Sequence, residues 1–576
     1  MHTMKQVEVL RNSKESSRRA ELKFGVSPDI YSEFFPGAKL KIRDFDNQYV
    51  ADALSIEFVE NYIFHRSGHE TERELKALLI QAQTGKGKNY WVHNVLRPIA
   101  HKHGKKVLYL SNRVALHSQE VRDARHYVNP ITSESGIYKD GIYEVGSIAL
   151  TKYHNVNIVV YGKTLDDFSN YLFVVIDECH FFMSDALFNA FTDLILEKIV
   201  EKFQHSYRVY MSATPEEVCE VIYSIEWRQA LKADEMTHEK YWNQMFFPTY
   251  SENNFYSGNS NPVLPVFRFT YDYSKYDQIY AFKKDDTLLD EVRKCKDGKK
   301  WIIFVNSIAH GEKLRKQLSE GGARVGFITS ESKRSHNAED IFVWTWLEQE
   351  RSLGNLDILI TTSVFDNGIS IKDPKVGHVV LYSDDRVEFL QELGRVRISS
   401  GKAPKVYFKK MEKNKCLNKE IAQQILNVFT LAYGNNKIYE AGYDIAEIDG
   451  DLAKAYKYAK EKGFKFIELV PAVVNNTNVF DIKVNQFARL VARDRLRAII
   501  EYEKLKNTDA NIAVKAQWLE KTSEEVTDME LPKSEDVERK LKRLLADYGG
   551  KKLTETSEQN SEVESEKNFL MLSKEV

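Results

Sequence analysis

Cysteine is scarce in this sequence, and its few copies are widely scattered. The 576-residue chain has four, at Cys179, Cys219, Cys295 and Cys416. None shows the short paired spacing of a zinc motif or the dense framework of a disulfide-stapled domain. We therefore expect neither a disulfide scaffold nor a zinc site, and we expect a reducing, cytoplasmic setting.

Long apolar runs and excess charge are also absent. No apolar run approaches the ~18 residues that span a bilayer, and the basic N-terminus is not followed by the apolar stretch of a signal peptide. A net charge of -2 argues neither for nor against nucleic acid, because a basic groove can sit on a neutral protein. We expect no membrane association, and the length predicts two to four domains.

One stretch combines the glycines and lysines of a phosphate-binding loop. An apolar run ends at Ile80, a glycine-rich turn follows, and apolar residues then recur at helical spacing from Tyr90 to Ala100. Strand, loop and helix in this order form an anion cradle of backbone N–H groups. The expected nucleotide ligands are Thr84, Gly85, Lys86, Gly87, Lys88 and Asn89. An ordinary turn is the alternative reading of this stretch.

The last loop position departs from the usual pattern. A serine or threonine hydroxyl normally holds Mg²⁺ there, and Asn89 takes its place. An amide oxygen is also a suitable ligand for a hard cation. Asn89 is therefore a candidate Mg²⁺ ligand.

Short apolar runs alternate with helix-length segments after residue 50, which predicts a parallel α/β sheet. The predicted strands are 77–80, 107–110, 158–161, 172–176 and 209–211. Ligands of such sheets bind beyond the carboxyl ends of the strands. Asp177 and Glu178 follow one strand there and suit Mg²⁺ binding and water activation, although a helix cap is the alternative. Ser212, Ala213 and Thr214 follow another strand.

The phosphate loop, the Asp177-Glu178-Cys179-His180 box and the Ser212–Thr214 turn together resemble the first motor domain of superfamily 2 helicases of the DEAD/DEAH-box type. The resemblance implies a RecA-like fold that binds ATP and Mg²⁺. It also implies that His180 couples the nucleotide to the Ser212–Thr214 turn. Asn112 and Arg113 fall where the family contacts the nucleic-acid backbone, although this match is looser.

A second alternating α/β block lacks a phosphate loop. Its apolar runs are 301–305, 325–328, 358–360, 379–381 and 406–408. Residues 361–369 resemble the family's motif V, which implies that Thr362 contacts nucleic acid and that Asp366 and Gly368 couple the domains. Residues 391–397 resemble motif VI, which implies that Gln391 and Arg395 complete the ATP site.

Motif VI also departs from the family. A second arginine is usual three residues after the first, but Ile398 stands there. Arg397 is a substitute if the loop is rearranged, and a surface arginine otherwise. Such a guanidinium neutralises charge that develops on the γ-phosphate.

The expected fold is α/β, with two RecA-like parallel-sheet domains in tandem and a mainly α-helical C-terminal region. The expected divisions are an N-terminal adapter (1–50), RecA-like domain 1 (51–230), a linker or insertion (231–285), RecA-like domain 2 (286–410), a helical domain (411–550) and a disordered tail (551–576). Alternating aromatic residues from 267 to 280 suggest an exposed strand that enters the second domain. Arg489, Arg493 and Arg497 share one helix face, either as a phosphate track or as a solvated surface.

The resemblance implies an ATP-dependent helicase or translocase whose cofactors are ATP and Mg²⁺. Its partner is nucleic acid. DNA is favoured because the Asp-Glu-Cys-His box and the motifs of the second block look more like those of DEAH-related and phage- or mobile-element-type helicases. RNA stays open because such motifs contact phosphates and sugars. Asn89 and Ile398 motivate a second hypothesis, an ATP-gated clamp that binds nucleic acid without unwinding it. A third is a translocase subunit that works with partner proteins in a larger DNA-processing complex.

Overall fold

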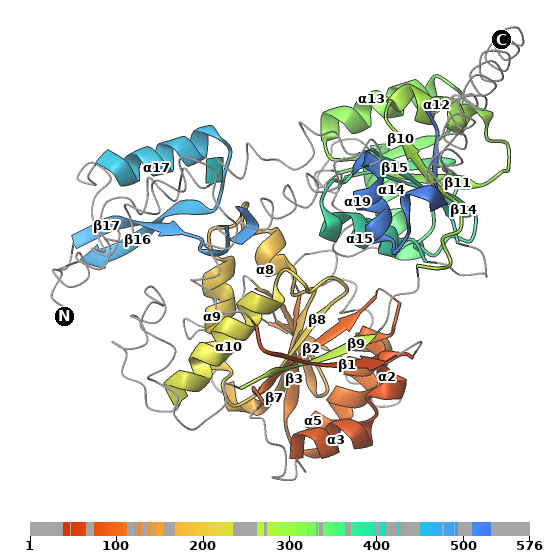
Figure 1. Cartoon of the computed structure of the whole chain (residues 1–576). Coiled ribbons are helices and arrows are strands. Elements are labelled where there is room, and N and C mark those ends of the chain that lie inside the picture. The colour runs from red at the N-terminus through yellow and green to blue at the C-terminus, as the bar shows by residue number, and fades with distance from the viewer. Residues whose placement is uncertain are drawn as a thin grey trace, which may run out of the picture.

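The computed structural model contains two parallel-sheet domains, one above the other in Figure 1. The structure describes residues 38–45, 48–64, 74–83, 85–111, 121, 124–127, 136–139, 142–153, 168–233, 262–269, 273–329, 332, 338–362, 370–397, 403–410, 424–425, 428, 450–474, 477–488, 490–492 and 510–530. In these ranges no helix is long and apolar enough to cross a membrane.

The first sheet has the strand order β1-β9-β2-β8-β7-β3-β6-β5-β4 in the described residues. Pairing is parallel from β1 to β6, and β5 and β4 add an antiparallel edge. The strands are β1 (Leu40–Phe45), β2 (Ala77–Ala82), β3 (Lys106–Ser111), β4 (Ile137–Lys139), β5 (Ile142–Val145), β6 (Ile148–Lys152), β7 (Tyr171–Asp177), β8 (Tyr207–Ser212) and β9 (Leu264–Phe269).

Helices cover both faces of the first sheet, so its central strands bury alternate residues in two separate cores. One face is covered by α2 (Val50–Ala53), α3 (Ile56–Phe64) and a continuous helix made of α4 (Lys88–Trp91), a π-helical turn (Val92–Leu96) and α5 (Arg97–Lys102). The other is covered by α8 (Phe181–Ser184), α9 (Thr192–Lys202) and α10 (Cys219–Ala233). A short 3₁₀ turn (Phe168–Asn170) precedes β7.

The second sheet is parallel throughout, with the order β12-β13-β11-β14-β15-β10-β18 among the described strands. Its strands are β10 (Ile279–Phe282), β11 (Lys300–Phe304), β12 (Val325–Ile328), β13 (Ile358–Thr361), β14 (Val376–Leu381), β15 (Lys405–Lys409) and β18 (Val526–Asp528). Its helices are α12 (Asp285–Lys294), α13 (Ile308–Ser319), α14 (Ala338–Glu350), α15 (Arg386–Arg395) and α19 (Ala510–Trp518), and a 3₁₀ turn (Ser523–Glu525) precedes β18.

The predicted α/β fold with two parallel sheets is confirmed, and nine of the ten predicted apolar runs coincide with strands. The tenth, 158–161, lies outside the described residues, as do 551–576 and the three arginines at 489, 493 and 497. The sequence did not reveal β1, because it carries Lys41, Arg43 and Asp44 in place of an apolar run. It also missed the short strands β4 to β6.

The prediction of an exposed strand over 267–280 is wrong. Residues 264–269 form β9, which pairs in parallel with both β1 and β2 inside the first sheet. Its side chains are buried on both faces, so aromatic residues there pack in the core. The expected adapter (1–50) and linker (231–285) thus each contribute a strand to the first domain, and β10 at 279–282 begins the second.

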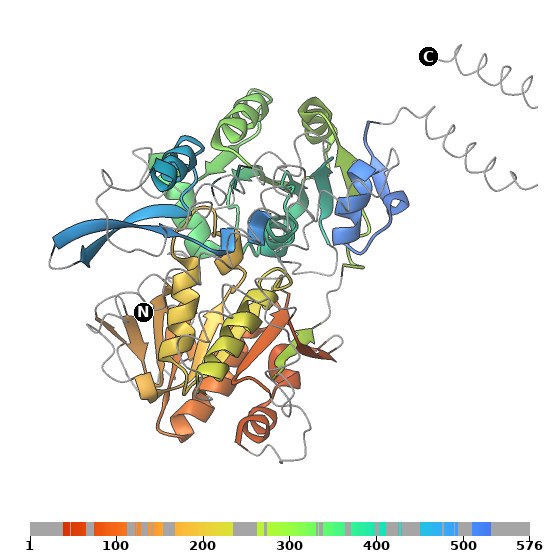
Figure 2. The ribbon, with the colours of Figure 1, turned by 60° about the vertical axis from the view of Figure 1, so that its left-hand side comes forward.

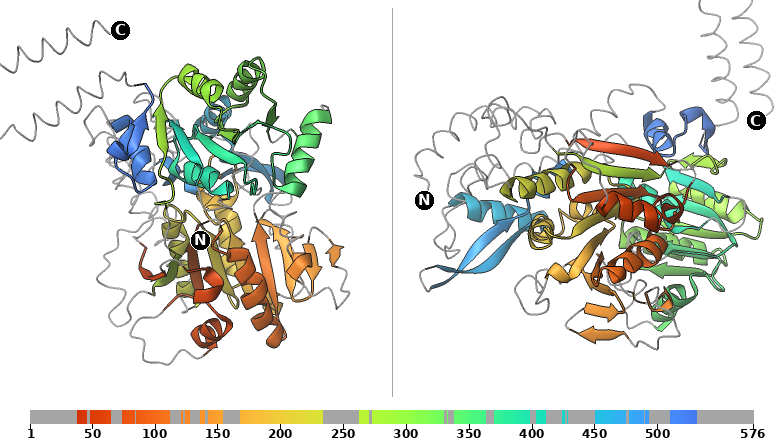
Figure 3. Two further views of the ribbon diagram at one scale, coloured as in Figure 1. Left: turned by 90° about the vertical axis from the view of Figure 1, so that its right-hand side faces the viewer. Right: turned by 90° about the horizontal axis from the view of Figure 1, so that it is seen from below.

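The C-terminal region packs on both domains. It contains α17 (Gly450–Glu461) and the antiparallel hairpin of β16 (Ile467–Val474) and β17 (Thr477–Val484), so its described part is not purely helical. The hairpin lies beside α8 and α9 (Figures 1 and 2). Its base is held there by Asn485, whose amide donates to Asn189 O and Thr192 Oγ1, and by the Lys483–Asp193 ion pair at 2.8 Å. By contrast, α19 and β18, drawn in dark blue, lie against the second sheet (Figure 3).

A buried ion pair fixes α10 to the first sheet. Arg208 on β8 binds Glu226 through two hydrogen bonds of 2.6 and 2.7 Å, and both side chains are almost fully buried. Removing one partner leaves a buried charge without compensation, which typically costs about 3–5 kcal/mol. We therefore expect Glu226→Ala to lower the unfolding free energy of this domain by about that amount, measured by denaturant unfolding.

Glu201→Ala is the matched control. It removes the half-exposed Lys198–Glu201 pair on neighbouring α9, and such pairs contribute about 0–1 kcal/mol. Equal destabilisation by the two substitutions would contradict a special role for the buried pair.

Candidate active site

The phosphate loop joins β2 to α4 in a conformation that requires glycine. Gly85 has φ +98° and Gly87 has φ +79°, a left-handed region that other residues rarely adopt. Gly87 is also the N-cap residue of α4, so the loop leads directly into the N-terminus of that helix, where backbone N–H groups can bind an anion. Lys88 is buried, and its Nζ donates at 2.8 Å to the main-chain oxygen of Ala82, which is the last residue of β2. The loop is therefore built as an anion cradle; Thr84 lies outside the described residues.

Helix α2 also contacts this loop. Val50 N donates to Lys86 O at 3.0 Å, which fixes the loop to α2. The preceding Tyr49 is 58% exposed, and its ring lies 3.7 Å from where a Cβ atom of Gly87 would stand. An exposed aromatic ring thus flanks the cradle.

The two carboxylates lie at the carboxyl end of β7, facing the loop. Asp177 ends the strand, and Glu178 adopts φ +51°, a left-handed conformation that is uncommon for a side chain of its size. Both are buried. Burial, followed by the charge of Glu178, raises the pKa of Asp177. Two acidic groups enclosed this way are stable as anions only beside positive charge.

Glu178 has that positive charge nearby. Its Oε2 lies 3.4 Å from His180 Nδ1, and its Oε1 lies 3.6 Å from Arg395 Nη2. Burial acts to raise the pKa of Glu178, but Lys88, His180 and Arg395 together outweigh it and lower the pKa below its usual value. Glu178 is therefore ionised at neutral pH and can orient a water molecule or accept its proton.

Tyr109 is a site residue that the sequence analysis missed. Its hydroxyl lies 2.7 Å from Asp177 Oδ2 and 2.9 Å from Asn89 Oδ1, and the side chain is fully buried. One hydroxyl proton cannot serve both oxygens at once. The position is inside an apolar strand sequence, so only the buried hydroxyl could have signalled its role. Tyr109 connects the two predicted metal ligands.

These residues fit a Mg²⁺ ion. Asp177 Oδ1 is buried and has no hydrogen-bond partner among the described residues. Carboxylate and amide oxygens are the ligands that hard divalent cations prefer. The predicted pair Asp177 and Asn89 therefore presents oxygen atoms on one side of the phosphate loop, with Tyr109 between them.

A chain of side chains connects the carboxylates to the second domain. His180 Nδ1 lies 3.1 Å from Ser212 Oγ, which accepts a hydrogen bond from Thr214 N at 3.0 Å. Gln391 on α15 donates from Nε2 to Thr214 Oγ1 at 3.2 Å. Ala213 is buried between the two hydroxyl residues. The turn at 212–214 thus touches both the nucleotide box and the second domain.

The second domain also brings two arginines to the site. Arg395 is the last residue of α15, and Val396 is extended with φ -89° and ψ 109°. Arg397 N donates to Ile371 O at 2.9 Å and Ile371 N donates to Arg395 O at 2.8 Å, which fixes this extended segment. Residues two apart in extended chain face the same side. Arg397 therefore reaches the site without an arginine at position 398.

Arg397 contacts the phosphate loop itself. A Cβ atom at Gly85 would lie only 2.6 Å from Arg397 Nη1. That nitrogen is buried and has no hydrogen-bond partner in the described part of the chain, whereas Nη2 donates to Ser370 Oγ at 3.1 Å. Burial, then the charges of Arg395 and Arg351, lower the pKa of Arg397 to about 10. An anion bound alongside Gly85 and Arg397 would offset this cost.

Thr362 is the remaining predicted site residue that the structure describes. Thr362 follows β13 and is half-buried, with its N–H donating to Ile328 O. Asn112, Arg113, Asp366 and Gly368 lie outside the described residues, as does Ile398. Their predicted contacts with nucleic acid or between domains stay predictions.

Replacing Gly85 with alanine tests the loop–arginine contact. The new Cβ would collide with Arg397 Nη1 and would also strain the left-handed backbone, which costs about 1–2 kcal/mol. We expect Gly85→Ala to weaken nucleotide binding and hydrolysis at least about tenfold, measured by equilibrium binding and steady-state turnover.

The control is Gly104→Ala. Gly104 is also left-handed, at φ +63°, but nothing lies within 4 Å of its Cβ position. It should lose stability and keep nucleotide binding. If both variants bind nucleotide equally well, the contact with Arg397 has no functional weight.

Comparison with known proteins identifies the family. Residues 40–217 match the family model "Type III restriction enzyme, res subunit", and residues 283–399 match "Helicase conserved C-terminal domain". Together these matches span more than half of the chain. No curated protein sequence matched.

Solved structures that match the chain share little sequence with it. Dbp5 of S. cerevisiae bound to RNA is 15% identical, with a TM-score of 0.38 over 62% of this chain and 83% of that one. The helicase Lhr of Mycobacterium smegmatis is 15% identical, with a TM-score of 0.39 over 72% of this chain and 57% of that one. A DEAD box protein of Methanococcus jannaschii is 16% identical, with a TM-score of 0.30 over 58% and 82%. On the two family matches, the chain belongs to the superfamily 2 helicases and is a nucleic-acid-dependent ATPase with two RecA-like domains.

Proposed function

We propose that this helicase is a DNA translocase or unwinding motor whose ATP site lies between its two domains. The observation that carries the proposal is the meeting of Arg397 with Gly85, and of Arg395 with Glu178, across the domain boundary. Residues from both domains are therefore needed to surround one nucleotide. Hydrolysis would change the affinity of the domains for each other, and that change moves the protein on its strand.

The roles of the site residues follow from their positions. The N–H groups of the 84–89 loop and the Lys88 ammonium hold the β- and γ-phosphates. Arg395 and Arg397 face them from the second domain and neutralise the charge that develops on the transferred phosphoryl group. Glu178 orients the attacking water and accepts its proton, because its neighbours keep it ionised.

The proposed metal site differs from the family pattern at position 89, where asparagine replaces serine or threonine. When bound, Mg²⁺ supplies charge neutralisation between the β- and γ-phosphates. Asp177 and Asn89 offer the oxygen ligands, and Tyr109 fixes the distance between them through its hydroxyl. Tyr109 thereby places a buried hydroxyl beside the position where relatives have serine or threonine.

The Ser212–Thr214 turn is the proposed transmission element. It receives the state of the nucleotide through His180 and passes it to α15 through Gln391. Arg395 Nη2 lies 3.4 Å from Gln391 Oε1. Helix α15 thus carries both Gln391, which contacts the turn, and Arg395, which contacts Glu178. A change at Glu178 can therefore reach the second domain by two routes.

DNA is the proposed strand, and partner proteins are proposed with it. The first domain matches the model of a restriction-enzyme subunit, and restriction enzymes act on DNA within multi-subunit assemblies. RNA is the alternative outcome of the test below. The non-unwinding clamp is the other candidate, favoured by Asn89 and by the absence of an arginine at 398. The contact of Arg397 with the loop supports the motor instead.

Tyr109→Phe tests the metal arrangement. The loss of one hydroxyl should loosen Asp177 and Asn89 and weaken Mg²⁺ binding by about 10–100-fold, as removal of a supporting group around a metal typically does. The measurement is Mn²⁺ affinity of the nucleotide complex by electron paramagnetic resonance, with the Mg²⁺ dependence of turnover beside it.

Tyr153→Phe is the matched control. The Tyr153 hydroxyl donates to the main-chain oxygen of Asp177, not to its carboxylate. It should leave metal affinity near wild type. An unchanged metal affinity in Tyr109→Phe would refute the proposed role.

Glu178→Gln tests whether the protein turns over ATP. We expect kcat to fall by about 10²–10⁴ while nucleotide binding persists, because the amide still fills the site but cannot accept a proton. Glu220→Gln on α10 serves as the control. Stimulation is measured with single-stranded DNA, duplex DNA and RNA in parallel at one stated salt concentration.

The outcomes separate the candidates. Turnover stimulated most by DNA and lost in Glu178→Gln supports the DNA motor. Stimulation by RNA alone reassigns the strand. Nucleotide-dependent strand binding without stimulated turnover identifies the clamp.

A further inference from the structure

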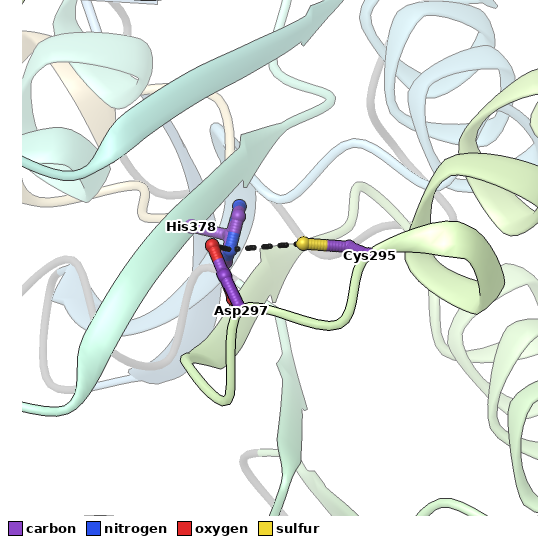
Figure 4. A group of neighbouring side chains, drawn as sticks. All are labelled: Cys295, Asp297 and His378. Carbon is purple, nitrogen blue, oxygen red and sulfur yellow. Dashed lines mark hydrogen bonds and ion pairs between the residues drawn. The ribbon is translucent and has the colours of Figure 1, made fainter.

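A second group of potential metal ligands lies in the second domain, away from the nucleotide site. Cys295 directly follows α12, Asp297 lies in the turn before β11, and His378 lies on β14. One ligand atom from each lies within 4.8 Å of the other two. The three side chains point toward one another (Figure 4). They stand at the amino ends of β11 and β14, whereas the ATP site is at the carboxyl ends.

We propose that Cys295, Asp297 and His378 bind a zinc ion. Cys295 Sγ lies 3.6 Å from His378 Nε2, and Asp297 Oδ2 lies 3.0 Å from the same nitrogen. Bonds of 2.0–2.3 Å at tetrahedral angles place zinc ligands about 3.3–3.6 Å apart. The Cys295–His378 distance matches this spacing, and the Asp297–His378 distance is shorter than it, so a small outward movement of the Asp297 carboxylate would complete three corners of a tetrahedron, with water as the fourth ligand.

The surroundings hold each ligand in place. His378 stacks on Trp301, with ring centroids 3.9 Å apart and an interplanar angle of 7°, and its Nδ1 lies 3.3 Å from Tyr407 Oη. A ring fixed through Nδ1 presents Nε2 to a metal. Asp297 Oδ1 accepts from Lys299 N at 2.9 Å, which leaves Oδ2 directed at His378. Both ligands thus have the second partner that metal sites usually show.

A hydrogen-bonded arrangement is the alternative to a metal. His378 Nε2–H can donate to Asp297 Oδ2 at 3.0 Å, and the Cys295 thiol can donate to the same carboxylate. A cation bonded to one atom of each side chain is the second way to satisfy all three, and metal titration separates the two arrangements. Lys405 Nζ, 4.0 Å from Asp297 Oδ2, shares this carboxylate and moderates the affinity.

The ligand types select the metal. A thiolate, an imidazole and one carboxylate favour Zn²⁺ over Mg²⁺, which prefers an all-oxygen shell. The ion would tie the turn at 295–299 to β14, so its role is structural. This site is independent of the ATP site and of the proposed motor function.

Cobalt substitution tests the site in the full-length protein. Metal-free protein is titrated with Co²⁺, which gives thiolate-to-metal charge-transfer absorption and the strong visible bands of tetrahedral coordination. We expect about one Co²⁺ per chain, displaced by Zn²⁺, and loss of the charge-transfer band in Cys295→Ser. Asp297→Asn should bind Co²⁺ about 10–100-fold more weakly, since the weaker amide ligand replaces a carboxylate.

Cys219→Ser is the matched control, because Cys219 is also a free, partly buried thiol but its Sγ contacts Glu216 O. This variant should keep the full spectrum. A wild-type protein without the charge-transfer band, or a band that survives in Cys295→Ser, overturns the proposal. Circular dichroism of Cys295→Ser checks that the variant is folded, and the Asp297→Asn titration decides the case if it is not.

Discussion

The interface between the two domains depends on placing positive charge against buried acids and phosphate-binding backbone. Arg395 is 3% exposed and pairs with Glu178, which is 5% exposed. Arg397 has a buried nitrogen against Gly85, and burial, followed by the like charge of Arg395, lowers the pKa of Arg397. Burying guanidinium groups is costly unless anions compensate them. In the proposed function, a nucleoside triphosphate would supply that compensation, so nucleotide binding and the contact between the domains would stabilise each other.

The C-terminal region contacts both domains. The hairpin base docks on the first domain through Asn485 and Lys483, while Lys515 on α19 docks on the second through Asp384 and Lys409 O. If the domains separate when the nucleotide leaves, this region still holds one chain segment on each of them.

The sequence predicted the strands that carry the chemistry because they are fully buried apolar runs, and it predicted Lys88, Asp177 and Glu178 because chemistry restricts those positions to few residue types. It did not predict β1 or the place of β9, since an edge strand with alternating charges lacks an apolar run and pairing between residues 40 and 264 leaves no local pattern. Tyr109 was hidden for a related reason. In sequence, a tyrosine within an apolar strand indicates only a core residue, and the structure is needed to show that its hydroxyl lies beside Asp177.

The two departures from the family pattern have the same kind of solution. The missing arginine at 398 matters only if the segment stays helical, where a spacing of three faces one side. Here α15 ends at Arg395 and the backbone becomes extended, so a spacing of two brings Arg397 to the loop. At position 89, the Tyr109 hydroxyl of β3 lies 2.9 Å from Asn89 Oδ1, and in the proposed metal site this pair takes the place of the missing hydroxyl. In both places a different residue reaches the position that the family's usual residue would occupy. Arg397 does so because the backbone becomes extended after α15, and the Tyr109 hydroxyl does so because it lies beside Asn89.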